Sequence, residues 1–170
     1  MDRNRWLLLV NFAIAFYNVG TVWLVQLSCY PLWAVVGRGE FGAYHEAWWQ
    51  SIWGVILGPG LLGFLGAWAM LWWLPPRVSA RAAWLGIALQ VAVYLLTAIW
   101  WAPLMARLVE VVDPSGTPTP LFRLLLSTHW LRVALFTAYG ILMFWMVGVS
   151  FGLGESETIT GSNRLQPAGS

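Results

Sequence analysis

Runs of apolar residues alternate with short polar segments along the chain, and four of these runs are long enough to cross a lipid bilayer. A membrane-spanning helix needs about 20 mostly apolar residues. The second run has no charged residue and ends at Pro75 and Pro76, because proline cannot continue the hydrogen-bond ladder of a helix. The four runs cover about residues 6–27, 49–74, 82–102 and 128–151.

This pattern predicts the fold class, an all-α integral membrane four-helix bundle with up-down topology. The bundle forms one transmembrane domain over residues 1–153, and we expect the polar segment 154–170 to be a flexible tail. Residues 40–48 and 121–127 also have helical patterns, and each precedes a span on the outer side. We expect short interfacial helices there, lying along the membrane surface or bending inward, because each would otherwise make its span too long to cross straight.

The composition agrees with a protein that has lipid as its solvent. Of the 170 residues, 59% are hydrophobic and 9% are charged, whereas soluble domains carry about 25% charged residues. All nine basic residues are arginine, and the net charge is only +2. The lack of lysine excludes Schiff-base chemistry, and the scattered arginines leave no patch for a nucleic acid. The single cysteine, Cys29, excludes a disulfide or a cysteine-rich metal site within this chain.

The arginines are divided unequally between the two membrane faces. Cytoplasmic loops of membrane proteins carry an excess of basic residues, so the face with more arginines is expected to be cytoplasmic. We therefore expect a protein of the bacterial inner membrane with both termini in the cytoplasm. One face carries Arg3, Arg5, Arg77, Arg81 and Arg164, and the other carries Arg38, Arg107 and Arg123.

Two stripes of polar residues run along predicted spans, and we expect both to face the bundle axis. Polar groups in hydrocarbon are costly and usually point into the bundle. The middle of the bundle has no ionisable group, so these stripes indicate interhelical hydrogen bonds rather than a proton path. Asn11, Asn18 and Gln26 share a face of the first span, and Gln90, Tyr94 and Thr97 share a face of the third.

Four residues at the outer end of the bundle are candidate catalytic residues. His45 and His129 are the only histidines, and each begins a span that enters from the outer side, so we expect both to line one shared cavity. Glu46 follows His45, and Arg132 lies about one helical turn into the fourth span. An arginine inside a span is costly unless it is paired. We therefore expect an ion pair between Glu46 and Arg132.

The outer cluster supports three hypotheses. In the first, Glu46 and Arg132 form a structural clamp, and the histidines make interfacial hydrogen bonds. In the second, the cluster is the polar wall of a pocket that binds or converts a lipophilic small molecule, with histidine as acid or base and arginine as anion holder. In the third, His45 and His129 hold a haem or a single metal ion. The candidate ligand-binding residues are Asn18, Gln26, Tyr30, Tyr44, Trp49, Tyr94 and Thr97.

The chain is rich in tryptophan, with 14 in all. Several crowd the outer boundary, where aromatic residues commonly anchor a protein at the membrane surface. Tryptophan-rich faces also suit packing against other subunits or pigments. The alternative function is therefore that of a non-catalytic subunit in a larger membrane complex for electron transfer or pigment binding.

A short motif at the outer end adds a family resemblance. The run Tyr30-Pro31-Leu32-Trp33, followed by Phe41, Tyr44, His45 and a tryptophan-rich helix, resembles small bacterial four-helix membrane proteins of the anthrone-oxygenase-like type. The resemblance covers the general plan of all four helices. It implies a membrane pocket for an aromatic or polyketide-like substrate, and it assigns no catalytic role to an individual residue.

Overall fold

The computed structural model describes residues 2–153, which form an all-α bundle of four long helices. Each helix is long and apolar enough to cross a membrane, so the predicted fold class is confirmed. The tail predicted over residues 154–170 lies outside the described residues. The four spans are Arg3–Trp33, Phe41–Trp72, Ala80–Ala106 and Pro120–Phe151.

Three of the four spans contain one wide π-helical turn between two α-helical parts. The first span consists of α1 (Arg3–Leu24), η1 (Val25–Cys29) and α2 (Tyr30–Trp33). The second consists of α3 (Phe41–Ile52), η2 (Trp53–Leu57) and α4 (Gly58–Trp72). The third consists of α5 (Ala80–Leu96), η3 (Thr97–Trp101) and α6 (Ala102–Ala106), and the fourth is the single helix α7 (Pro120–Phe151).

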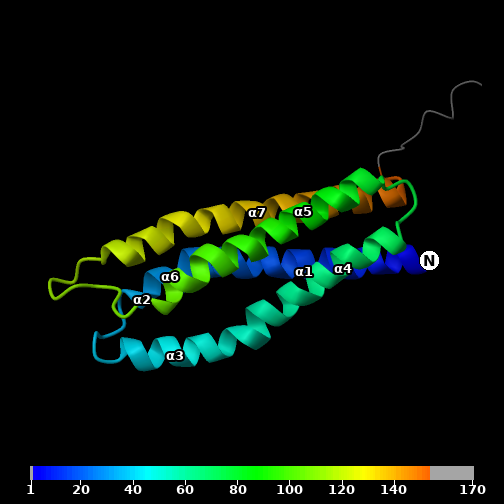
Figure 1. Ribbon diagram of the computed structural model, residues 1–170. Coiled ribbons are helices and arrows are strands. Elements are labelled where there is room, and N and C mark those ends of the chain that lie inside the picture. Colours follow the sequence, from blue (N-terminus) through cyan, green and yellow to red (C-terminus); the bar gives the residue numbers. More distant parts are fainter. Residues whose placement is uncertain (1, 154–170) are drawn as a thin grey trace, which may run out of the picture.

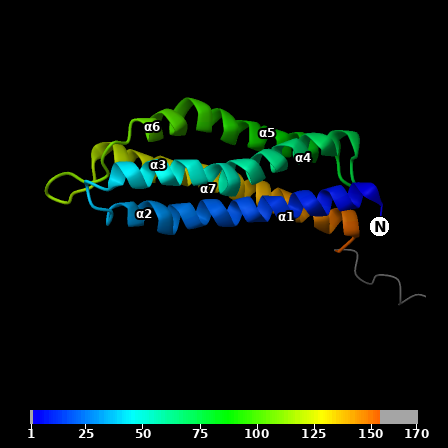
Figure 2. The same ribbon diagram turned by 90° about the horizontal axis from the view of Figure 1, so that it is seen from below.

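The spans form a ring in which neighbours in sequence are neighbours in space. Helix α1 packs against α4 and α7, and α5 packs against the same two helices. The second and fourth spans are therefore diagonal, as an up-down bundle requires. The N-terminus and the end of α7 lie at one end, which we call the terminal end (Figure 1). The opposite end, where α2, α3 and α6 lie, is called the pocket end (Figure 2).

Helix α3 diverges from the rest of the bundle at the pocket end (Figure 1). Its contacts with the first span are made by large side chains. The Trp33 ring lies 4.9 Å from that of Trp48 and 5.8 Å from that of Phe41. Bulky aromatic rings thus hold α3 at a distance, and this separation leaves room for a cavity between α3 and the other spans.

The three π turns share a relation to proline. Pro31, Pro59 and Pro103 each lie six residues after the first residue of a π turn, at Val25, Trp53 and Thr97. Proline lacks the backbone N–H and its ring clashes with the carbonyl four residues earlier, so the helix widens and bends there.

One carbonyl released by a proline has a new partner. The α-helical partner of the Val55 carbonyl would be the N–H that Pro59 lacks. Instead, the Tyr17 hydroxyl of α1 donates a 2.9 Å hydrogen bond to this carbonyl. The bond ties the bend of the second span to the first span.

Two segments that we expected to be separate interfacial helices are continuous with their spans. Residues 41–48 belong to α3, and residues 121–127 belong to α7. At 1.5 Å per residue, the 32 residues of α7 extend about 48 Å, against about 30 Å for the hydrocarbon core. These helices therefore either project beyond the hydrocarbon or tilt within it.

The loops at the pocket end are fixed by polar contacts. The Arg38 guanidinium and the Glu110 carboxylate form a 2.7 Å ion pair between the two loops. The Asp113 carboxylate accepts hydrogen bonds from Ser115 and Thr117, and these bonds lower the pKa of Asp113. The ion pair therefore joins the loop between the first and second spans to the loop between the third and fourth spans.

The expected polar stripes face the bundle interior. Asn11, Asn18, Gln26 and Gln90 are all buried, which confirms their predicted orientation. Glycines of α4 make room for the stripe residues. A Cβ atom on Gly60 would lie 2.7 Å from the Tyr94 hydroxyl, and one on Gly63 would lie 3.4 Å from the Asn18 amide nitrogen.

Candidate functional site

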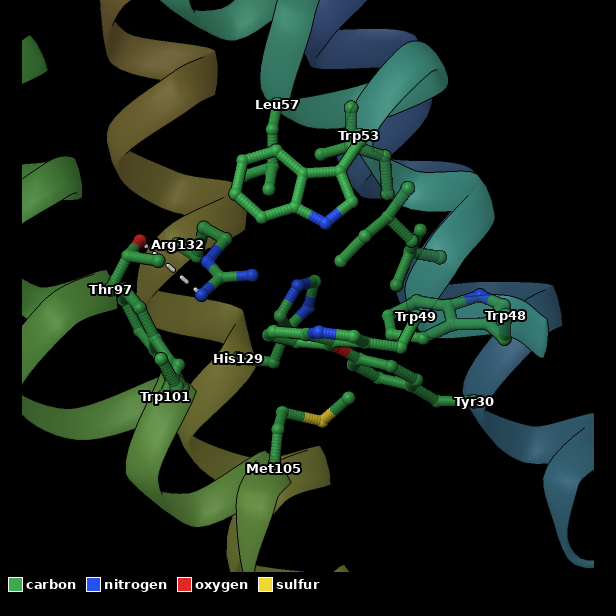
Figure 3. Close-up of a pocket in the computed structure, with 14 residues that line it drawn as sticks. Tyr30, Trp48, Trp49, Trp53, Leu57, Thr97, Trp101, Met105, His129 and Arg132 are labelled. Atoms are coloured by element: carbon green, nitrogen blue, oxygen red, sulfur yellow. Dashed lines mark hydrogen bonds between the residues drawn. The ribbon is translucent and has the colours of Figure 1, made fainter. Parts of the chain in front are cut away.

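A cavity of about 240 Å³ lies at the pocket end, between the diverging α3–η2 segment and the other spans. All four spans contribute to its walls, and the π turns supply several of the lining side chains, including Trp53 and Leu57 of η2. Figure 3 shows Arg132 and His129 pointing into a space surrounded by indole and phenol rings. The principal apolar walls are Tyr30, Trp48, Trp49, Trp53, Trp101 and Met105.

His129 is held in one orientation by the first span. Its ring is 1% exposed, and its Nδ1 lies 2.8 Å from the Gln26 Oε1. The Gln26 Nε2 donates a 3.2 Å hydrogen bond to the Leu126 carbonyl. The Tyr30 ring meets the imidazole edge to face at 4.9 Å.

These bonds determine which nitrogen of His129 carries the proton. The Leu126 carbonyl only accepts hydrogen bonds, so the Gln26 amide must direct its NH₂ group toward it. The Gln26 oxygen then faces His129 and only accepts, so Nδ1 must be the donor. In the neutral imidazole, Nε2 is the remaining ring nitrogen, and it offers a lone pair to the cavity.

Arg132 lies one helical turn beyond His129 on the same face of α7. Its Nη2 donates a 3.3 Å hydrogen bond to the Thr97 hydroxyl, which itself donates to the Val93 carbonyl. Its guanidinium carbon lies 4.2 Å from the centre of the Trp101 ring. The Arg132 Nε is buried without a hydrogen-bond partner and does not reach the cavity. The terminal nitrogen that is not bonded to Thr97 points into the cavity (Figure 3), so the guanidinium is held in position and keeps a donor for a bound molecule.

The predicted ion pair between Glu46 and Arg132 is wrong. The Glu46 carboxylate accepts a 2.9 Å hydrogen bond from Gln50 on the exposed face of α3. Within residues 2–153, the ion pairs join Arg5 to Asp2 and Arg38 to Glu110. The helix containing Glu46 diverges from α7, so no carboxylate of the described chain neutralises Arg132.

The prediction of one cavity shared by the two histidines is also wrong. His45 lines a second cavity of about 260 Å³ with Glu46, Trp49 and Ala106. Its ring is stacked between Phe41 and Trp48, at 5.5 and 6.3 Å. Trp49 lines both cavities and lies between the two sites.

The described residues do not form the two-histidine metal or haem site that we considered. His45 and His129 face different cavities, so they do not flank a common axial position. Within residues 2–153, no group of three or more His, Cys, Asp or Glu side chains could hold a metal ion. Each of the two cavities therefore contains a single imidazole.

The other candidate residues fall into three groups. Tyr30, Trp49 and Thr97 line the main cavity as expected, and Gln26 lies behind His129. Asn18 and Tyr94 lie deeper in the bundle, where the Asn18 amide is 3.5 Å from the Pro59 carbonyl. Tyr44 is largely exposed beside Trp33, so it takes no part in this cavity.

Sequence reasoning missed four of the principal walls of the cavity: Trp48, Trp53, Trp101 and Met105. A signal for two of them was present, since Trp53 and Trp101 fall in turns that a following proline widens. Met105 carries no comparable signal. Its position in the cavity wall depends on the divergence of α3, which the sequence does not predict.

We compared the chain with family models, curated proteins and solved structures, and found no match. The main cavity combines a hydrophobic interior, a fixed hydrogen-bond acceptor at His129 and a cation, Arg132, that has no carboxylate partner within residues 2–153.

Proposed function

We propose that this protein binds a flat lipophilic small molecule in the cavity at the pocket end. The proposal rests on the surroundings of Arg132. This half-buried cation has no carboxylate partner in the described chain, and it lines a cavity whose other walls are mainly aromatic rings. An ionisable residue inside a membrane span is expensive and usually has a functional role. A bound molecule with a polar oxygen would use the donors that Arg132 keeps.

The size and walls of the cavity indicate the shape of the ligand. An apolar protein cavity of about 150 Å³ accommodates benzene, so about 240 Å³ suits a bicyclic ring system. Indole rings at Trp49, Trp53 and Trp101 offer flat faces for stacking. Trp53 is 62% exposed at the rim, which suits entry from the lipid. The resemblance to anthrone-oxygenase-like proteins implies a ligand of the same aromatic kind.

The cavity also contains a group that can move a proton. His129 presents Nε2 beside the position where Arg132 would hold an oxygen. Such a base supports proton abstraction from a bound molecule, so conversion of the ligand is compatible with the site.

We further propose a location in the bacterial inner membrane, with the terminal end toward the cytoplasm. Arg3, Arg5, Arg77 and Arg81 belong to the terminal end, against three arginines at the pocket end apart from Arg132. The excess of basic residues on the cytoplasmic side supports this orientation. Under it, the cavity faces the outer leaflet.

Quenching of tryptophan fluorescence by 1-nitronaphthalene in nanodiscs tests the binding proposal. Ala102→Phe places a ring in the cavity wall, and Ala98→Phe places the same ring on the exposed face of the same span. We expect saturable quenching in the wild type and in Ala98→Phe, and only the unsaturable lipid background in Ala102→Phe. Equal curves for all three proteins up to the solubility limit of the probe would refute the proposal.

The alternative, a non-catalytic subunit, draws on tryptophans that face outward. Trp72 is 71% exposed and Trp84 is 54% exposed, and either could pack on another subunit. A membrane-interface belt explains the same exposure. Gentle purification distinguishes the two functions, because a subunit would remain in a larger assembly with visible or near-infrared absorption and would show no saturable quenching by the probe.

A further inference from the structure

We infer that the ligand of the main cavity is a lipophilic weak acid, an aromatic molecule with an ionisable O–H group. The inference rests on the proposed function and specifies its ligand class. The O–H would donate to the His129 Nε2, and the same oxygen, or one next to it, would accept from Arg132. Both side chains line the cavity, and they lie three residues apart on one face of α7.

The first step is the fixed polarity of His129. The Gln26 Oε1 accepts a 2.8 Å hydrogen bond from the His129 Nδ1–H, because the Gln26 NH₂ group donates to the Leu126 carbonyl at 3.2 Å. The imidazole cannot switch tautomers without leaving a buried donor or acceptor unpaired, which is costly. The cavity therefore presents an acceptor at His129, and the matching group on the ligand is a hydrogen-bond donor.

The second step is the polarity of Arg132. A guanidinium only donates hydrogen bonds. In the described chain Nη2 donates to Thr97, and the other terminal nitrogen has no partner and points into the cavity (Figure 3). The matching group on the ligand is therefore an acceptor, and an anionic oxygen is the best one. A ketone, quinone or ether supplies acceptors alone and leaves the His129 Nε2 unmatched. A hydroxyarene or a carboxylic acid satisfies both residues.

The arrangement also allows the proton to move. The O–H bond of the ligand breaks, the His129 Nε2 gains the proton, and the electron pair stays on the ligand oxygen. The resulting imidazolium keeps its Nδ1–H bond to the Gln26 oxygen, and the resulting anion faces the Arg132 guanidinium. One proton changes place, no electron is transferred, and no co-reactant is needed.

A matched pair of probes tests the inference without any variant. The probe 4-nitro-1-naphthol carries the O–H group, and its visible absorption changes when it ionises. Its methyl ether, 1-methoxy-4-nitronaphthalene, keeps the ring system but lacks the donor. We expect the naphthol to bind about tenfold more tightly than the ether, the factor that corresponds to leaving the His129 Nε2 acceptor buried without a partner.

Variants then separate the roles of the two residues, each variant checked for an unchanged oligomeric state and a cooperative melting transition. In His129→Phe, which removes the acceptor, the naphthol and its ether should bind equally. In Arg132→Met, which removes the donor to the shared oxygen, both probes should bind more weakly and the preference for the naphthol should remain. If wild-type protein binds both probes equally, the ligand-class inference is wrong while the proposed function stands. If neither probe shows saturable binding, the proposed function itself is wrong. Retention of the preference in His129→Phe would also overturn the inference, and so would unchanged binding of both probes in Arg132→Met.

Discussion

Gln26 on the first span and His129 on the last are joined by a hydrogen bond of 2.8 Å in the interior of the bundle. The Nε2 of the same glutamine donates a 3.2 Å hydrogen bond to the Leu126 carbonyl of α7. One side chain therefore fixes both the position of the fourth span against the first and the tautomer of the histidine. The polar stripe of the first span thus contributes directly to the candidate site.

Replacement of Gln26 by methionine should destabilise the protein by about 1–3 kcal/mol, because it leaves the Nδ1 donor of His129 buried without a partner. Gln50→Met is the matched control, since Gln50 is exposed and bonded only to Glu46. The measurement is the free energy of unfolding in detergent by titration with a denaturing surfactant. Equal losses of unfolding free energy in the two variants would show that the hydrogen bond to His129 stabilises the protein no more than the exposed bond of Gln50 does.

Arg132→Met should leave the stability of the ligand-free protein unchanged or raise it by about 1 kcal/mol. The variant removes a half-buried charge that has no carboxylate partner in the described chain, and apolar replacement of such groups is often neutral or stabilising. It also removes the cation–π contact with Trp101, which limits the gain. The same variant should bind both the naphthol and its ether more weakly, because the donor to their shared oxygen is gone.

Arg38→Met is the control for the arginine prediction. Arg38 pairs with Glu110 at 2.7 Å in an exposed position, where ion pairs contribute at most about 1 kcal/mol. This variant should therefore lose a little stability and keep ligand binding. A loss of more than about 2 kcal/mol in Arg132→Met would show that the arginine is a structural element rather than a binding group.

The bend of the second span predicts a coupling between Pro59 and Tyr17. In the wild type, the Tyr17 hydroxyl bonds to the Val55 carbonyl, so Tyr17→Phe should cost about 1 kcal/mol. Pro59→Ala supplies a backbone N–H to the same carbonyl, and in that background the cost of Tyr17→Phe should largely disappear. A double-mutant cycle on unfolding free energies measures this coupling, and strictly additive losses would contradict it.

The topology predicts opposite accessibility for two introduced cysteines. Gly39→Cys lies in a loop at the pocket end, where its side chain would meet open space, and Leu153→Cys lies at the exposed end of the fourth span. In a Cys29→Ala background, an impermeant maleimide added to intact cells should label the first and leave the second unlabelled until the membrane is opened. Labelling of both cysteines from one side would contradict four spans, and the reverse pattern would contradict the orientation.

Much of the fold followed from the sequence because the lipid solvent makes span lengths and polar stripes easy to read. The buried positions of Asn11, Asn18 and Gln90 were predicted from helical spacing alone. The helix ends were predicted too short, since polar residues at the pocket end continue helices beyond the apolar runs. Hydropathy measures the portion of a helix that lies in hydrocarbon, and it does not mark where the hydrogen-bond ladder ends.

The candidate site was predicted only in part. His129, Arg132 and Trp49 were found because buried polar groups and aromatic residues at one depth are visible in the pattern. The predicted ion pair between Glu46 and Arg132 is wrong because two residues at the same depth in the membrane can lie on helices that are far apart. The divergence of α3 is produced by aromatic rings packed between helices, and that packing is invisible in a single helix pattern.

The most direct test of the central claim is a crystal structure of the protein with 4-bromo-1-naphthol, using the anomalous signal of bromine to locate the ligand. We predict an ordered bromine site inside the main cavity, with the naphthol oxygen about 3 Å from the His129 Nε2 and from the Arg132 guanidinium. A bromine signal confined to lipid-facing grooves, such as the one lined by Trp23 and Trp130, with the main cavity filled by side chains, would contradict the account.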